Sequence, residues 1–180
     1  RNPLGPLSNA AHIIRLSFRD HPGIGYPLRI IERQVQFIEG WRTEQFAQQL
    51  VDVGLLQSTD AFMAATQDPK WNDEFAFLHT RPSGVALEGY LFPDTYKFAP
   101  GTPIRTIIEA MVDHFRKSFG SEMALIGTGL TMHQTVTLAS IVETEARLPA
   151  ERPLVASVYL NRINKRMLLG ADPTVIYALK

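Results

Sequence analysis

Residues 131–147 read TMHQTVTLASIVETEAR, and this stretch decides how the rest of the chain is interpreted. Thr131, followed three residues later by Gln134, is typical of a capping box and predicts a helix that starts here. The apolar arc of this helix is formed by Met132, Val136, Ala139, Val142 and Ala146. With about 100° of rotation per residue, Glu143 falls in the middle of that arc. We therefore expect its carboxyl group to be partly shielded from water, which raises a carboxyl pKa.

Glu143 has a catalytic and a non-catalytic explanation. As a shielded acid it would protonate a leaving oxygen, as at a glycosidic bond. As a structural residue it would pair with Arg147 one helical turn later, or reach solvent at the edge of the arc. Glu145 falls about 160° away around the same helix, so the two carboxylates cannot share one role.

A two-carboxylate mechanism would require a partner for Glu143. Ordinary glycosidases place two carboxyl groups on opposite sides of the scissile bond. The partner would then have to be Glu88, Asp94 or Asp172. A single acid suffices where the substrate carries its own nucleophile, and the sequence leaves both mechanisms open.

Composition excludes several classes of function. Lys plus Arg and Asp plus Glu both number 18, so no net charge draws the chain to nucleic acid or an anionic membrane. With no cysteine there is no disulfide framework and no thiolate nucleophile. The five histidines lack the spacing of a metal site, and no phosphate-binding or dinucleotide motif is present. We therefore expect no metal and no cofactor, and a neutral or polyhydroxyl partner.

The first part of the chain is predicted to be irregular and then mixed in structure. Residues 1–33, rich in Gly and Pro, are interpreted as an appendage. Residues 34–38 alternate polar and apolar side chains as a strand does, and residues 44–53 have helical spacing. Ser58 and Asp60 are expected to open a short helix that runs to Thr66.

The remainder is predicted to be a loop-built wall followed by helices. Residues 68–103 combine Pro, Gly and aromatics, a pattern of turns and short strands rather than helix. Residues 103–119 form an amphipathic helix. Pro153 opens a helix that is apolar around most of its circumference and should be buried on nearly all sides. A turn then precedes a last helical run at residues 175–179. The fold class is therefore α+β, helix-rich, with a small strand-and-loop wall.

Two further features have the composition of a binding site. Residues 87–96, LEGYLFPDTY, combine three aromatics, two acids and a turn, which suits the apolar face and polar rim of a sugar ring. The alternative is an ordinary aromatic-stabilised hairpin. Asn161 falls beside Leu154 and Val158 on the Pro153 helix, so we expect it to enter a packed environment. There it would either orient substrate or bond to a backbone carbonyl.

Five segments together resemble the endolytic murein transglycosylase family (MltG or YceG-like) across most of residues 34–180. These segments are FIEGW (37–41), LEGYLFPDTY (87–96), ASIVETE (139–145), ASVYLNR (156–162) and DPTVIY (172–177). The resemblance implies a lytic transglycosylase domain at residues 34–180. It also implies that residues 1–33 are a remnant of a LysM-like module and that the domain is truncated at its C-terminal end.

The resemblance also implies a mechanism. Family members cut peptidoglycan strands internally, at the MurNAc–GlcNAc bond, and their catalytic acid corresponds to Glu143. This residue would protonate the glycosidic oxygen and then accept the proton of the C6 hydroxyl, which closes a 1,6-anhydro ring without water. The segments imply that substrate is bound by Glu88, Asp94, Thr95, Tyr96, Asn161, Asp172, Thr174 and Tyr177.

Location and partners also come from the resemblance. Family members act in the bacterial cell envelope, at the extracytoplasmic face of the inner membrane, through an anchor that this sequence does not contain. Their partners would be glycan strands and cell-wall synthesis proteins. Two alternatives stay open, a non-catalytic module that binds peptidoglycan or a partner protein, and a hydrolase with a second carboxylate close to Glu143.

Overall fold

The computed structural model describes residues 32–119 and 127–179 of the chain. The predicted N-terminal appendage at residues 1–33 lies outside the described residues except for its last two positions. The predicted α+β, helix-rich class with a small sheet is confirmed. None of the helices in the two described segments is long and apolar enough to cross a membrane.

A two-stranded antiparallel sheet forms the base of the N-terminal lobe, residues 32–119. Strand β1 (Arg33–Gln36) pairs with β2 (Thr95–Phe98), with Val35 opposite Tyr96. The strand predicted at residues 34–38 is confirmed in place, although pairing starts one residue earlier and ends at Gln36. Val35 is buried while its two strand neighbours are not, so alternation gives the sheet one face for the core.

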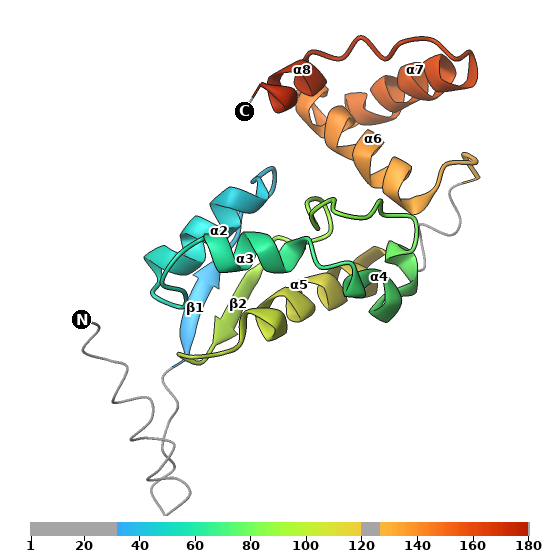
Figure 1. The fold of residues 1–180 in the computed structure, drawn as a ribbon. Coiled ribbons are helices and arrows are strands. Elements are labelled where there is room, and N and C mark those ends of the chain that lie inside the picture. Colours follow the sequence, from blue (N-terminus) through green and yellow to red (C-terminus); the bar gives the residue numbers. More distant parts are fainter. Residues whose placement is uncertain (1–31, 120–126, 180) are drawn as a thin grey trace, which may run out of the picture.

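Four helices and a 3-10 turn complete the N-terminal lobe with this sheet (Figure 1). They are α2 (Thr43–Asp52), α3 (Asp60–Thr66), α4 (Lys70–Glu74), the 3-10 turn η1 (Ala76–Leu78) and α5 (Ile104–Phe119). The buried side of α5 consists of Ile107, Ile108, Met111, Val112 and Phe115. These side chains lie three and four residues apart, so one continuous stripe of α5 faces the core.

The expectation of turns and strands without helix for residues 68–103 is wrong in one part. Helix α4 and η1 both lie there, and only β2 is a strand. Asp68 starts α4, because its carboxylate accepts a hydrogen bond from the backbone N of Lys70 at 2.9 Å. Five residues are too few for a helical period to show in the sequence, and Trp71 anchors this turn by being fully buried.

In the C-terminal lobe, residues 127–179, all the regular elements are helices, joined by loops. It contains α6 (Met132–Glu145), the 3-10 turn η3 (Pro149–Glu151), α7 (Arg152–Asn164) and α8 (Asp172–Ala178). The capping box of α6 is confirmed: Thr131 Oγ1 accepts from Gln134 N at 3.2 Å, and Gln134 Oε1 accepts from Thr131 N at 2.9 Å. Helix α8 starts at Asp172, three residues before the predicted run, with Pro173 in its first turn.

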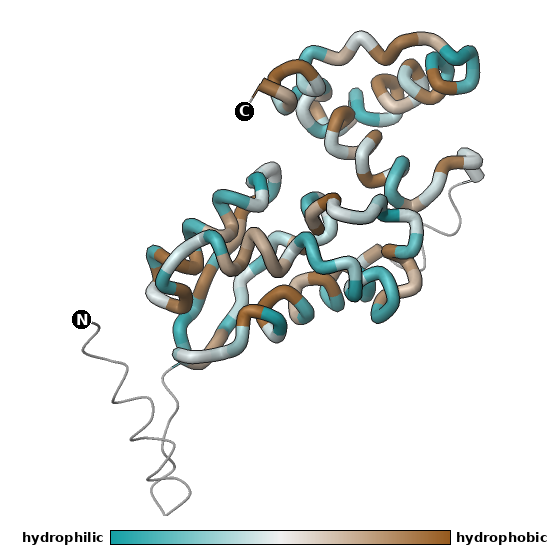
Figure 2. Tube along the Cα trace, viewed as in Figure 1, coloured by the Kyte–Doolittle hydropathy of each residue, from teal (hydrophilic) through white to brown (hydrophobic). Residues whose placement is uncertain are grey.

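Burial of α7 on nearly all sides is contradicted. Tyr159 is its one buried residue, whereas Leu154 is 69% and Val158 45% exposed. Helix α7 packs against α6 with one side, and its remaining apolar side chains face outward. Figure 2 shows the same pattern along the lobe, where apolar segments continue onto the α7–α8 connection and α8.

Helix α6 joins the two lobes. At its N-terminal end Met132 and Val136 pack against the core of the N-terminal lobe, beside η1. At its C-terminal end Leu138, Ile141 and Val142 form a separate small core with α7. In Figure 1, α6 accordingly rises from the end of the N-terminal lobe and carries α7 and α8 beyond it.

Candidate functional site

Glu143 lies in the last turn of α6 with an exposed side chain. The expectation that apolar neighbours shield it is therefore wrong in this structure. The buried arc of the C-terminal half of α6 is centred on Leu138, Ile141 and Val142, and Glu143 falls about 145° from that centre. No ion pair joins Glu143 to Arg147, so the structural explanation by that contact is not supported either.

The position of Glu143 on α6 is nevertheless informative. It falls within about 20° of Met132 and Val136 around the helix, because it follows them by eleven and seven residues. Those two side chains pack against the N-terminal lobe. Glu143 therefore continues the same stripe past the contact, about 10 Å further along the axis than Val136. By this geometry Glu143 belongs to the stripe of α6 whose N-terminal end contacts the N-terminal lobe, and its side chain is exposed.

The point where α6 meets the N-terminal lobe is Gly89 of the LEGYLFPDTY segment. Gly89 has φ +83°, and a Cβ placed on it would lie 2.6 Å from Cγ1 of Val136. Next to it the fully buried Tyr90 places its hydroxyl 3.2 Å from Nδ1 of His133. Burial raises the pKa of Tyr90 to about 12. Gly89 and Tyr90 thus form the contact of the N-terminal lobe with α6. Because the ring of Tyr90 is buried, it is not available to stack on a sugar.

Glu145 has a different neighbour. The hydroxyl of Tyr159, on α7, donates a hydrogen bond to Glu145 Oε1 at 3.3 Å. Burial and the nearby carboxylate of Glu145 raise the pKa of Tyr159. The structure thus places Glu145 on the α7 side of α6, in agreement with the prediction that the two carboxylates of this helix point to different sides.

Glu88 is half-buried and holds the start of α2. Its Oε2 accepts from Thr43 N at 3.2 Å and from Thr43 Oγ1 at 3.1 Å. Burial, then the charge of this carboxylate, raises the pKa of Tyr177 on α8, and Arg42 Cζ lies 4.5 Å from the centroid of the Tyr177 ring. Two predicted site residues far apart in sequence are therefore brought together, and Arg42, which the sequence analysis did not select, belongs with them. Its one sequence signal is that it directly follows the FIEGW segment.

Asp94, Thr95 and Tyr96 form a second group at the start of β2. Asp94 Oδ1 accepts from Thr95 N at 2.6 Å, and Asp94 Oδ2 lies 3.4 Å from His114 Nδ1. The hydroxyl of Tyr96 donates to the carbonyl of Phe92 at 2.8 Å and lies 3.3 Å from the same His114 nitrogen. Burial, then the charge of Asp94, raises the pKa of Tyr96. His114 on α5 was missed, because a histidine at the edge of an amphipathic helix has no sequence signature.

The remaining predicted site residues lie on the surface of the C-terminal lobe. Asn161 is exposed on α7, which contradicts the expected packed environment, because that side of α7 has no neighbouring element in the described part of the chain. Asp172 is the exposed first residue of α8. Thr174 is exposed, and its hydroxyl donates to the carbonyl of Ala171 at 2.7 Å.

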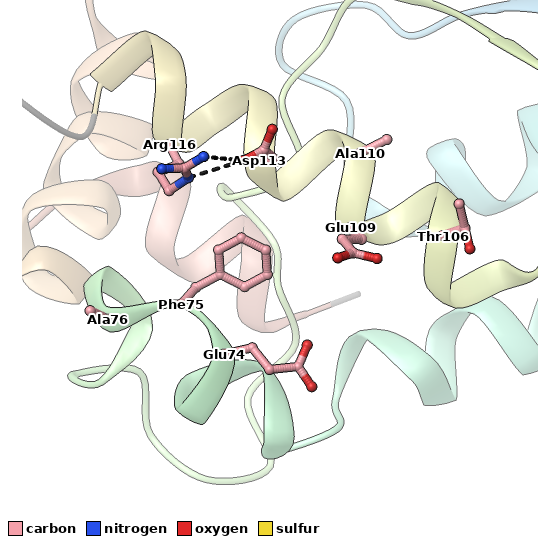
Figure 3. Close-up of a pocket in the computed structure, with 8 residues that line it drawn as sticks. All are labelled: Glu74, Phe75, Ala76, Thr106, Glu109, Ala110, Asp113 and Arg116. Carbon is pink, nitrogen blue, oxygen red and sulfur yellow. Dashed lines mark hydrogen bonds and ion pairs between the residues drawn. The ribbon is translucent and has the colours of Figure 1, made fainter.

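A cavity of about 840 Å³ lies elsewhere, between α4 and α5 (Figure 3). It is lined by Glu74, Phe75, Ala76, Thr106, Glu109, Ala110, Asp113 and Arg116. Asp113 bonds to Arg116 at 2.6 Å and to Lys117 at 2.6 Å, and these hydrogen bonds hold the pKa of Asp113 below its usual value. None of the predicted site residues lines this cavity, so it does not define the candidate site.

The candidate site is thus a helix-borne acid beside a loop-and-strand wall in an α+β domain. Comparison with known proteins assigns the domain to a family: the YceG-like family matches residues 19–180, and this chain belongs to it. A solved YceG-like protein from Listeria monocytogenes superimposes with a TM-score of 0.69 at 28% identity, over 81% of this chain and 52% of that one.

Two curated relatives are named endolytic murein transglycosylase. The protein of Bacillus subtilis (strain 168) is 44% identical over 96 residues, which are 51% of this chain and 26% of that protein. The protein of Streptococcus pneumoniae serotype 2 (strain D39) is 33% identical over 158 residues, 78% of this chain and 28% of that protein. This chain therefore spans about a quarter of the length of these relatives.

Proposed function

We propose that this domain carries the catalytic acid of a lytic transglycosylase that cuts peptidoglycan strands at the MurNAc–GlcNAc bond. The observation that carries the proposal is the position of Glu143. It lies in the ASIVETE segment of a YceG-like domain, on the stripe of α6 that leads from Gly89 along the N-terminal lobe. The relatives named endolytic murein transglycosylase support the choice of substrate and reaction.

The proposed reaction needs one carboxyl group. Protonated Glu143 gives its proton to the glycosidic oxygen, the C1–O bond breaks, and positive charge develops on the MurNAc ring. The C6 hydroxyl of the same sugar attacks C1 and passes its proton to the Glu143 carboxylate, so the 1,6-anhydro ring closes and the acid is regenerated. Water is neither consumed nor released, and Glu145, bonded to Tyr159, has no part in it.

Exposure of Glu143 sets a condition on this mechanism. A general acid must hold its proton when the glycosidic bond breaks. A glycan strand lying between α6 and the N-terminal lobe would exclude water from Glu143, and desolvation raises a carboxyl pKa. We infer that bound substrate keeps Glu143 in its protonated form. The proposed contacts of the substrate are Glu88, Asp94, Thr95, Tyr96, Asn161, Asp172 and Thr174, whereas Tyr177 lies against Arg42.

Replacement of Glu143 tests the proposal. Glu143→Gln keeps the size and exposure of the side chain but has no proton to give, so release of glycan fragments from purified sacculi should fall by about 10²-fold or more. Glu145→Gln, two residues away and also exposed, is the matched control and should retain activity within about threefold. Equal activity of Glu143→Gln and the parent chain would reject the proposal.

A binding module is the second candidate, and one observation favours it. Glu88 and Tyr177, both expected to hold substrate, contact each other, and Glu143 is exposed. A non-catalytic module would bind sacculi without releasing soluble fragments, and the parent chain and Glu143→Gln would bind with equal affinity.

For either function we propose that the protein is located in the cell envelope, at the extracytoplasmic face of the inner membrane. We propose cell-wall synthesis proteins as partners of the full-length protein.

A further inference from the structure

Tyr177 makes a contact between α8 and the N-terminal lobe that neither the family match nor the relatives assign. Its ring lies against the guanidinium group of Arg42, 4.5 Å from Arg42 Cζ to the ring centroid. Burial, followed by the charge of Glu88 and a hydrogen bond to it, raises the pKa of Tyr177. Because 55% of its surface remains exposed, this residue is not part of a core and acts through these two contacts.

The residues next to Tyr177, Arg42 and Glu88, are held in place at the start of α2. Glu88 Oε2 accepts two hydrogen bonds from Thr43, the first residue of α2, where a carboxylate is also favoured by the helix dipole. The backbone N of Arg42 donates to Gln45 Oε1 at 2.9 Å. Arg42 Nε is buried, makes no hydrogen bond within the described chain and lies 3.6 Å from Glu44 Oε2, so an ion pair with α2 also holds the guanidinium beside Tyr177. Figure 1 shows the loop before α2 projecting toward α8.

This contact matters because of where the other contacts between the lobes lie. Met132, His133 and Val136 seat α6 at its N-terminal end, about 10 to 17 Å along the axis from Glu143. A helix held at one end can pivot, and Glu143 is near the other end. Helix α8 packs against α6 and carries Tyr177, so Tyr177 ties the moving end to the N-terminal lobe.

We propose that Tyr177 is a positioning residue that docks between Arg42 and Glu88, and so fixes the distance from Glu143 to the wall of the N-terminal lobe. Arg42 and Glu88 contribute to this docking in different ways. Stacking of the Arg42 cation on the ring contributes attraction, and the nearby Glu88 carboxylate offers the Tyr177 hydroxyl an acceptor. The link to Glu143 rests on the proposed function, whereas the docking itself does not.

A distance measurement tests the docking without substrate. The chain has no cysteine, so nitroxide labels on Asp52→Cys in α2 and Lys165→Cys after α7 report the separation of the lobes by double electron–electron resonance. We expect one narrow distribution in the parent chain, a broad one in Tyr177→Leu and Arg42→Gln, and an intermediate width in Tyr177→Phe, which keeps the ring. Ile176→Ala is the matched control, because Ile176 is also 55% exposed on α8.

Circular dichroism on the same samples separates pivoting from unfolding. A broad distribution with unchanged helix content supports the proposal. A distribution in both Tyr177→Leu and Arg42→Gln as narrow as in the parent chain overturns it. If Tyr177→Leu loses helix content, Arg42→Gln and Tyr177→Phe decide, since both alter only side chains at the surface of the contact.

Kinetics on sacculi distinguish positioning from substrate binding. A positioning role predicts that Tyr177→Phe lowers kcat at least fivefold with KM within about twofold, because ground-state contacts to substrate are unchanged. A substrate-binding role predicts the opposite, a raised KM with kcat retained, and would overturn the proposal. If the parent chain shows no cleavage at all, the proposed function fails while the distance measurement still decides the docking.

Discussion

Val136 of α6 lies so close to Gly89 that a Cβ on Gly89 would be 2.6 Å from Cγ1 of Val136. This approach fixes where α6 leaves the N-terminal lobe. Glu143 follows Val136 by seven residues, close to two helical turns, so it projects from the same stripe of the helix. The direction of the candidate acid is thus set by a glycine in a loop more than forty residues earlier in the chain.

Gly89→Ala should destabilise the chain for two reasons. Its φ of +83° disfavours a side chain, and the added methyl group would meet Val136. We expect the free energy of unfolding to fall by about 2–4 kcal/mol, of which the clash contributes about 1–3 kcal/mol. Urea denaturation followed by circular dichroism measures the change.

Gly84→Ala is the control for backbone strain alone. Gly84 has φ +77°, and a Cβ added to it would have nothing within 4 Å. It should cost about 1–2 kcal/mol. In the double variant Gly89→Ala with Val136→Ala the clash should disappear, so the two substitutions should be less costly together than their sum. Strict additivity would show that α6 does not rest on Gly89.

Protonation of His133 at low pH should weaken the contact between α6 and the N-terminal lobe. Burial, then the charge of Arg81, lowers the pKa of His133 from its usual 6.5. The unfolded chain therefore takes up a proton at higher pH than the folded chain, and stability rises with pH across this window. The contribution is fully present above about 6.5 and is lost as pH falls from there to the lowered folded value.

His133→Gln should remove this part of the pH dependence. The facing groups are the Tyr90 hydroxyl, uncharged in this range, and the Arg81 cation, charged throughout, so neither adds a titration of its own. The unfolding free energy of the parent chain and the variant, measured from pH 5 to pH 8, should converge in slope above about 7 and differ below it. Equal slopes at all pH values would contradict the assignment.

Arg81 is predicted to be the most sensitive charged residue of the N-terminal lobe. It is 3% exposed and donates to the carbonyls of Thr66, Val85 and Asp68 and to the side chain of Asn72. Arg81→Met would leave these buried acceptors without a donor, at a cost of about 2–5 kcal/mol in urea denaturation. The exposed Arg116, paired with Asp113, is the matched control, and Arg116→Met should cost under about 1 kcal/mol.

The start of α6 could be predicted because its cause is local. Thr131 and Gln134 satisfy each other's backbone groups, and that reciprocal pair is visible in four consecutive residues. The pairing position of β1 and the extent of α3 were likewise accessible from alternation and from Asp60. Each of these features depends on residues within a few positions of one another.

The exposure of Glu143 could not be predicted, because the two ends of α6 pack on different neighbours. The apolar arc drawn over the whole helix merges two faces: Met132 and Val136 pack on the N-terminal lobe, whereas Val142 packs on α7. A helical wheel averages both, so Glu143 falls in the middle of an arc that no single neighbour covers. Only the arrangement of the lobes separates the two faces.

The contacts of the other site residues depend on the fold in the same way. Arg42 and Tyr177 meet across more than a hundred residues, and His114 meets Asp94 across the interval between β2 and α5. No spacing rule connects such positions. The segments 87–96 and 172–177 could be identified as a pair by resemblance, but the partners of Glu88 and Tyr177 could not.

The mass of the ends released from purified peptidoglycan tests the central claim most directly. Anhydro ends and reducing ends differ by one water, so a single mass spectrum of digested sacculi separates the two chemistries. We expect the parent chain and Glu145→Gln to release 1,6-anhydro-MurNAc ends, and Glu143→Gln to release none. Reducing ends in place of anhydro ends, or anhydro ends from Glu143→Gln, would contradict the central claim.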